Sequence, residues 1–168
     1  MTFTTIFMLV VFAVIMVAGI AAGINMLSSS RVSNTTQETA QIVANVDGAF
    51  SNQSSFTGLT NTLAIAEKLV PSNMVPSGST TNIVNPYGGA VTLQADATIP
   101  NAFDVTNAGL GNAACAAVAE QESAYEVEIN GAVVASNGTS VPPATAQTDC
   151  NAGPGANSVT VVNTQTSG

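Results

Sequence analysis

Two cysteines, Cys115 and Cys150, are the side chains of this sequence with the most defined chemistry. Two cysteines in an exported domain most often form one disulfide, and a pair of buried free thiols is the alternative. A bridge closing a loop of about 35 residues would stabilise the fold by roughly 3–4 kcal/mol on the chain-entropy model. A disulfide would place the folded domain outside the cytoplasm, where thiols are oxidised.

Carboxylates gather at one place in the sequence, which holds Glu120, Glu122, Glu126 and Glu128. Glu126 and Glu128 lie two positions apart in a strand-like run, so both are expected on its solvent face. A weak calcium site is the alternative to a solvated strand face. The sequence has no histidine, which excludes Ser-His-Asp and Cys-His nucleophiles and most zinc sites. We therefore predict no catalytic, cofactor-binding or metal site and no enzymatic activity.

The overall charge of the 168-residue chain bounds its partners. Lys and Arg number two against ten acidic residues, for a net charge of −8. Such an acidic chain does not hold a phosphate backbone, which excludes nucleic acid as a partner. Only 7% of the residues are charged, far below the roughly 25% usual in globular domains. A neutral polar surface favours an exported protein that packs against copies of itself.

The segment that must position the rest is Met1–Leu27, which carries no charge. About 20 apolar residues in a helix cross a bilayer, so a retained membrane helix is expected. A secretory signal peptide fits poorly, because no basic residue precedes the apolar run. Gly19 and Gly23 interrupt the helix and are candidates for local melting, or for close packing between helices.

Beyond Leu27 a polar sequence keeps a helical pattern, with one narrow apolar stripe. The residues of this stripe are Val32, Thr35, Thr39, Ile42, Val46, Ala49 and Phe50. We therefore expect one helix from about residue 2 to about residue 51. Its first half is apolar and its second half is amphipathic.

The remaining sequence predicts two further helices, five strands and long loops. A second helix is expected over Thr57–Leu69 and a third over Asn112–Glu120, while Pro71–Thr81 and Ser136–Ala156 are expected to be loops. The expected strands are Ala90–Ala95, Ala102–Thr106, Tyr125–Ile129, Ala132–Ala135 and Ser158–Asn163. Asn130-Gly131 is a strong hairpin signal. The order of elements predicts an α+β head whose mostly antiparallel sheet packs on the amphipathic half of the long helix.

These features divide the chain into three parts. Residues 1–27 are the hydrophobic stem, residues 28–52 the amphipathic half of the same helix, and residues 53–168 the globular head. Within the head, residues 115–150 form a C-terminal region bounded by the two cysteines.

In this arrangement the chain resembles the type IVb pilins over nearly its whole length. Met1-Thr2-Phe3-Thr4-Thr5-Ile6 is similar to the start of a mature type IVb pilin, and Met1 to Ser51 to the pilin stem. Asn85-Pro86-Tyr87-Gly88-Gly89 and Ala102–Thr106, followed by a helix bearing Cys115, are similar to the head. Within the family, the chain most resembles the thin-pilus subunits of conjugative plasmids.

The resemblance implies a structural subunit of a helical surface filament that serves adhesion, aggregation or mating-cell contact. It implies a Gram-negative bacterium, with the subunit held in the inner membrane and its head in the periplasm before assembly. A prepilin peptidase would create a processed and methylated N-terminus at Met1, and the numbering would begin after that cleavage. The implied partners are further copies of the chain, inner-membrane assembly machinery, and minor pilins or a tip adhesin. The implied filament core is formed by Phe3, Ile6, Phe7, Leu9, Val10, Phe12 and Val14.

One residue departs from the family pattern. Most type IV pilins have glutamate at the fifth mature position, thought to pair with a neighbour's N-terminal amine, whereas this chain has Thr5. A buried charge without a partner costs several kcal/mol. The departure therefore leaves room for a minor pilin or pseudopilin. A monomeric membrane-anchored binding domain is a second alternative, from another class of protein.

Overall fold

The computed structural model describes residues 28–165, so the expectations for the stem, residues 1–27, lie outside it. Residues 28–50 are helical. This helix buries side chains at steps of three and four, as the sequence predicted, whereas Ala49 is exposed. The buried side chains are those of Val32, Thr35, Thr39, Ile42, Val46 and Phe50. Among residues 28–165, no helix is long and apolar enough to span a bilayer.

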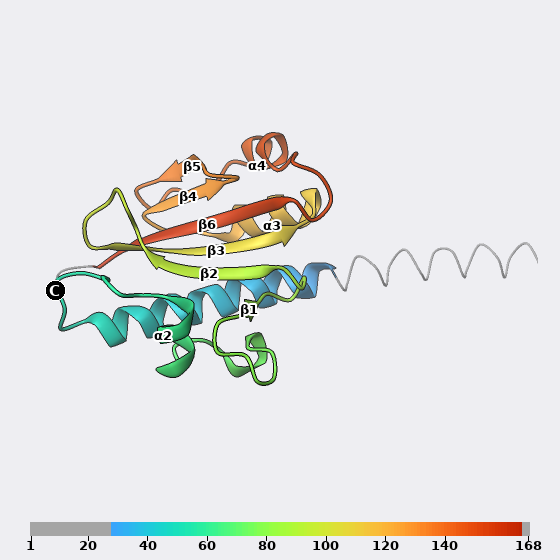
Figure 1. The fold of residues 1–168 in the computed structure, drawn as a ribbon. Coiled ribbons are helices and arrows are strands. Elements are labelled where there is room, and N and C mark those ends of the chain that lie inside the picture. Colours follow the sequence, from blue (N-terminus) through green and yellow to red (C-terminus); the bar gives the residue numbers. More distant parts are fainter. Residues whose placement is uncertain (1–27, 166–168) are drawn as a thin grey trace, which may run out of the picture. The chain divides into compact units, whose positions relative to one another are not determined.

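A six-stranded antiparallel sheet forms the centre of the head (Figure 1). Its strands are β1 (Ile83–Val84), β2 (Ala90–Ala95), β3 (Ala102–Leu110), β4 (Glu126–Ile129), β5 (Ala132–Ser136) and β6 (Asn157–Thr164). The spatial order is β1-β2-β3-β6-β4-β5, so the last strand of the chain lies between β3 and β4. The expected α+β fold with an antiparallel sheet is confirmed.

Helices cover one face of this sheet, which we call the inner face. Ile42 and Val46 of the long helix share a buried cluster with Leu93 of β2 and Val105 of β3. The second buried cluster joins α3 (Asn112–Gln121) to the inner-face valines and isoleucine of β4 and β6. The core residues of this second cluster include Val118, Val127, Ile129, Val159 and Val161. Both clusters together hold the helices against the sheet by removing apolar surface from water.

Three phenylalanines secure the end of the long helix. The ring centroids of Phe50 and Phe56 are 5.3 Å apart, and those of Phe56 and Phe103 are 4.6 Å apart. Such tilted aromatic pairs favour fixed mutual orientations beyond simple burial. Phe56 therefore fixes the chain that leaves the helix against β3.

Three expected elements differ in the structure, and one of them is the predicted loop Pro71–Thr81, which contains a short 3₁₀ helix, η1 (Ser72–Met74). The helix predicted over Thr57–Leu69 is only α2 (Asn61–Ala66), because Gly58 has φ +91° and Thr60 caps the helix by accepting from the Leu63 N–H. The predicted loop Ser136–Ala156 contains α4 (Pro143–Asp149). Proline at the first helical position fixes φ without removing a helical hydrogen bond, so this proline starts a helix.

The two hairpin turns lie where the sequence predicted turns. Asn130 and Gly131, between β4 and β5, have φ of 54° and 80°. A two-residue type I′ turn requires positive φ at both of these positions. In the turn between β1 and β2, Asn85 accepts from the backbone N–H groups of Tyr87 and Gly89, both at 3.0 Å. Its amide donates to the Ala108 carbonyl at 2.9 Å. A single asparagine thus ties this turn to β3.

Candidate functional site

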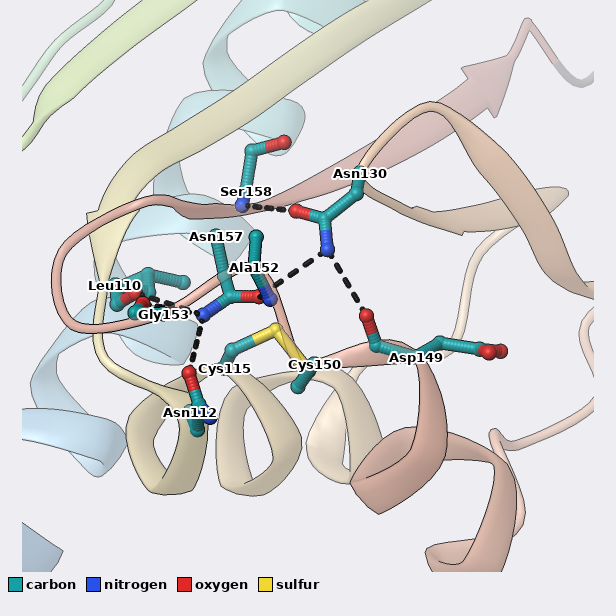
Figure 2. The surroundings of a disulfide bond; sticks show 10 residues. All are labelled: Leu110, Asn112, Cys115, Asn130, Asp149, Cys150, Ala152, Gly153, Asn157 and Ser158. Carbon is teal, nitrogen blue, oxygen red and sulfur yellow. Dashed lines mark hydrogen bonds between the residues drawn. A yellow bond between two sulfur atoms is a disulfide. The ribbon is translucent and has the colours of Figure 1, made fainter.

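The disulfide-bounded region, residues 115–150, is the first candidate site. Cys115 of α3 and Cys150, which follows α4, form a disulfide with Cα atoms 5.8 Å apart (Figure 2). Both cysteines are almost fully buried. The predicted disulfide is confirmed, and the alternative of two free thiols is wrong.

Asn157, at the start of β6, organises the backbone around the disulfide (Figure 2). It is fully buried. Its amide nitrogen lies 2.9 Å from Asn112 Oδ1, 3.1 Å from the Gly153 carbonyl and 3.2 Å from the Leu110 carbonyl. Its Oδ1 accepts from the Ala152 N–H at 3.0 Å. One side chain thus joins the end of β3, the start of α3 and the loop after Cys150.

Asn130 extends this network from the β4–β5 turn. Its Oδ1 accepts from the Ser158 N–H at 2.9 Å. Its amide nitrogen donates to the Asp149 carbonyl at 2.9 Å and to Asn157 Oδ1 at 3.1 Å. The sequence predicted Asn130 only as a turn residue and made no prediction for Asn157. Their partners lie up to 47 positions away in the sequence, so no local pattern reveals the network.

The second candidate is the face of the sheet opposite the helices, which we call the outer face. Register places Gln94, Asp104, Val162 and Glu126 in one row across four strands. Thr92, Thr106, Thr160, Glu128 and Val133 form the next row. Glu126 and Glu128 therefore share one strand face, as predicted, although both are half-buried.

Carboxylates on and beside this face alter one another's ionisation. Burial, followed by repulsion from Asp96 and Glu128, raises the pKa of Asp104 to about 6, although Gln94 donates a hydrogen bond to it. Burial also acts to raise the pKa of Asp96. Hydrogen bonds from the Ile99 and Thr98 backbone and the Thr98 hydroxyl outweigh this effect, so the pKa of Asp96 is lowered. The outer face thus carries negative charges that repel each other.

The other two glutamates of the predicted cluster lie elsewhere. Glu120 is half-buried on α3, and Glu122 follows that helix with only 8% of its surface exposed. Burial alone raises the pKa of Glu122 to about 7. Residues 28–165 contain no group of three Asp, Glu, Cys or His side chains arranged to hold a metal ion. The calcium alternative therefore gains no set of ligands here.

The remaining predicted site residues belong to the stem and lie outside the described residues. They are the processed N-terminus Met1, the departure Thr5, the helix-melting candidates Gly19 and Gly23, and the filament-core residues Phe3, Ile6, Phe7, Leu9, Val10, Phe12 and Val14.

Comparison with known proteins defines the class of this molecule. The crystal structure of a type IVb pilin from Salmonella typhi is similar, with 17% identity and a TM-score of 0.57. The match covers 82% of this chain and 99% of that chain. TcpA, a type IV pilin from Vibrio cholerae El Tor biotype, has 15% identity and a TM-score of 0.55, with coverages of 80% and 99%. The fold is therefore that of a type IVb pilin, as the sequence predicted.

The family follows from a separate comparison. The model of the PilS N-terminal family matches residues 29–164, which is nearly all of the described chain. The chain belongs to the PilS family. No curated protein matches its sequence.

Proposed function

We propose that this chain is the structural subunit that polymerises into a helical type IVb pilus on the cell surface. The observation that carries the proposal is the match of the PilS N-terminal family to residues 29–164 of a head with the type IVb pilin fold. A fold built around a helix, a sheet and a disulfide, with no grouped metal ligands in residues 28–165, suits a structural role. Such a pilus would serve adhesion, aggregation or contact between mating cells in conjugation.

The proposed path to the filament begins in the inner membrane of a Gram-negative bacterium. Met1–Leu27 lies in lipid and the head in the oxidising periplasm, which agrees with the Cys115–Cys150 disulfide. A prepilin peptidase removes a leader and Met1 becomes the methylated N-terminus. The assembly machinery then moves the subunit into the filament, with minor pilins or a tip adhesin as further partners.

In the filament the stem helices exchange lipid for one another. Because lipid is as apolar as the helix surface, association rests on close packing rather than on new hydrophobic burial. The residues proposed to pack in this core are Phe3, Ile6, Phe7, Leu9, Val10, Phe12 and Val14. Melting near Gly19 and Gly23 would let the stem lengthen as it packs.

Thr5 supports a second candidate, a minor pilin or pseudopilin that primes assembly without forming the bulk polymer. The fifth position lacks a carboxylate that could neutralise a buried amine. In the leading proposal, the hydroxyl groups of Thr4 and Thr5 would solvate that amine instead. The two candidates differ in the abundance of the chain in the filament.

Gentle shearing of cells, electron microscopy and intact mass of the main released protein test the proposal. The expected result is thin filaments made chiefly of this chain, two hydrogens lighter than the reduced chain because of the disulfide. An added methylene would mark Met1 as the processed N-terminus. Filaments that contain only traces of the chain would favour the minor pilin. A chain that remains in the membrane fraction would overturn the pilus proposal and favour an anchored binding domain.

A further inference from the structure

A groove of about 510 Å³ opens beside the loop that leads from α2 toward β1. Its lining is mostly apolar, with Ile65, Val70, Val75 and Pro76 among the contributing residues. Pro76 also lines a hollow with Ile83 and Val84, which places the groove at the β1 edge of the sheet. An apolar hollow of this kind fits an apolar side chain that projects from another molecule.

Lys68 gives this groove a charge preference. It lines the groove, is exposed, and has φ of 57° in the turn that ends α2. It is also the only cationic side chain between residues 32 and 165. An apolar hollow with a single ammonium group selects a partner with an apolar projection and neighbouring carboxylates.

The β5 edge of the same head carries such a surface. Val133 is 54% exposed and lies opposite Glu128 in the register of β4 and β5. Glu126 lies two positions before Glu128 on the same face of β4. Burial, then the charges of Asp96 and Glu126, raises the pKa of Glu128, so a cation from another molecule would relieve the repulsion among these carboxylates.

We propose that the groove of one copy of this chain receives Val133 of a second copy, with Lys68 of the first paired to Glu128 and Glu126 of the second. The inference rests on the proposed function and assigns one contact between subunits of the filament. β1 and β5 are the two edges of the sheet (Figure 1), so the surfaces lie at opposite ends of the strand order. A contact between different patches at opposite edges repeats as an open chain instead of closing a pair.

Exchange of the two charges tests the contact in cells that express the full chain. Lys68→Glu and Glu128→Lys should each reduce sheared filaments at least about tenfold, because each places like charges together in the contact. The double variant, Lys68→Glu with Glu128→Lys, should recover part of the yield, because it restores the pair between positions 68 and 128 in reversed sense while Glu126 still repels the carboxylate introduced at position 68. Glu120→Lys makes the same charge change on α3, away from both surfaces, and should assemble normally.

A second measurement does not depend on the yield of charge variants. Ser77 lines the groove and is exposed, so Ser77→Cys combined with Val133→Cys should give disulfide-linked ladders between copies in filaments. Either single cysteine variant alone should give no ladder beyond a dimer.

The outcomes separate this inference from the proposed function. If the wild-type chain forms filaments and both single charge variants also assemble normally, the contact is overturned and the proposed function stands. Filaments of the double cysteine variant that show no ladder would have the same meaning. A wild-type chain that forms no filaments at all would overturn both. Recovery by the charge exchange together with the ladder supports the contact.

Discussion

The amide of Asn107 on β3 donates a buried 3.0 Å hydrogen bond to the hydroxyl of Thr39 on the long helix, across 68 positions of sequence. The Thr39 hydroxyl in turn donates to the Thr35 carbonyl at 2.8 Å. Thr39 and Asn107 are each 1% exposed. This pair adds a directional contact to the apolar packing and ties one turn of the amphipathic helix to β3.

We predict that Thr39→Val destabilises the head by about 1–3 kcal/mol, since it leaves the buried amide of Asn107 without an acceptor. The double variant Thr39→Val with Asn107→Leu should lose less than the sum of the two single variants. Urea unfolding of the four proteins gives the coupling energy. Strictly additive losses would show that the hydrogen bond does not link the two sites.

The Asn107–Thr39 bond illustrates what the sequence could and could not predict. Helical spacing predicted that Val32, Thr39 and Ile42 face the sheet, because burial sets that period. It did not identify Asn107 as the partner, since the contact depends on the position of a strand far along the chain. Helix α4 differs from the predicted loop for another reason, because prolines such as Pro142 and Pro143 are typical of loops but also begin helices.

The disulfide should be structural. Cys115→Ala with Cys150→Ala is expected to lower the free energy of unfolding by roughly 3–4 kcal/mol. Asn157→Ala, which keeps the disulfide, should also destabilise the head because it leaves the carbonyl groups of Leu110 and Gly153 and the Ala152 N–H without their partner. Urea unfolding of both variants under oxidising conditions measures the two effects. A cysteine-free variant as stable as the wild type would contradict a structural role.

Stability should depend on pH through Glu122. Burial raises its pKa in the fold to about 7 from a value of 4.5, so the folded chain holds this proton more tightly than the unfolded chain. The resulting stability is fully present below about pH 4.5 and is lost as the pH rises through about 7. The free energy of unfolding should therefore fall between about pH 5 and pH 8, by at most about 1.4 kcal/mol per pH unit for this group.

Glu122→Gln is the matched control, because it keeps the shape of the protonated side chain and cannot ionise. Denaturant unfolding at several pH values should show a flatter profile for this variant. Asp104, whose pKa burial raises to about 6, contributes in the same direction and should leave a smaller residual slope. An unchanged pH profile in Glu122→Gln would assign the dependence to other groups.

A close approach of two backbones predicts a glycine that tolerates no substitution. A Cβ atom at Gly89 would lie 1.8 Å from the Ala108 carbonyl oxygen and 2.9 Å from the Gly109 Cα. Gly89→Ala must therefore move the β1–β2 turn away from β3 and should cost about 3 kcal/mol or more. Gly48→Ala meets no atom within 4 Å on the long helix and should be neutral or stabilising by up to about 1 kcal/mol. Thermal unfolding of both variants compares the two positions, and equal stability would contradict the close approach.

The proposed melting of the stem gives a prediction for assembly. Gly19→Leu with Gly23→Leu should keep membrane insertion, because leucine is apolar, but should impair filament formation.

Two further double variants separate the effect of helix unwinding from the effect of close packing between helices. Gly19→Ala with Gly23→Ala raises helix propensity by about 1 kcal/mol per site while keeping small side chains, so it impairs assembly only if unwinding is needed. Ala18→Leu with Ala22→Leu adds bulk at the same spacing without removing glycine, so it impairs assembly if close packing near these positions is what matters. Sheared filament yield at equal membrane content measures all three, and normal filaments from the leucine variant at Gly19 and Gly23 would contradict both roles.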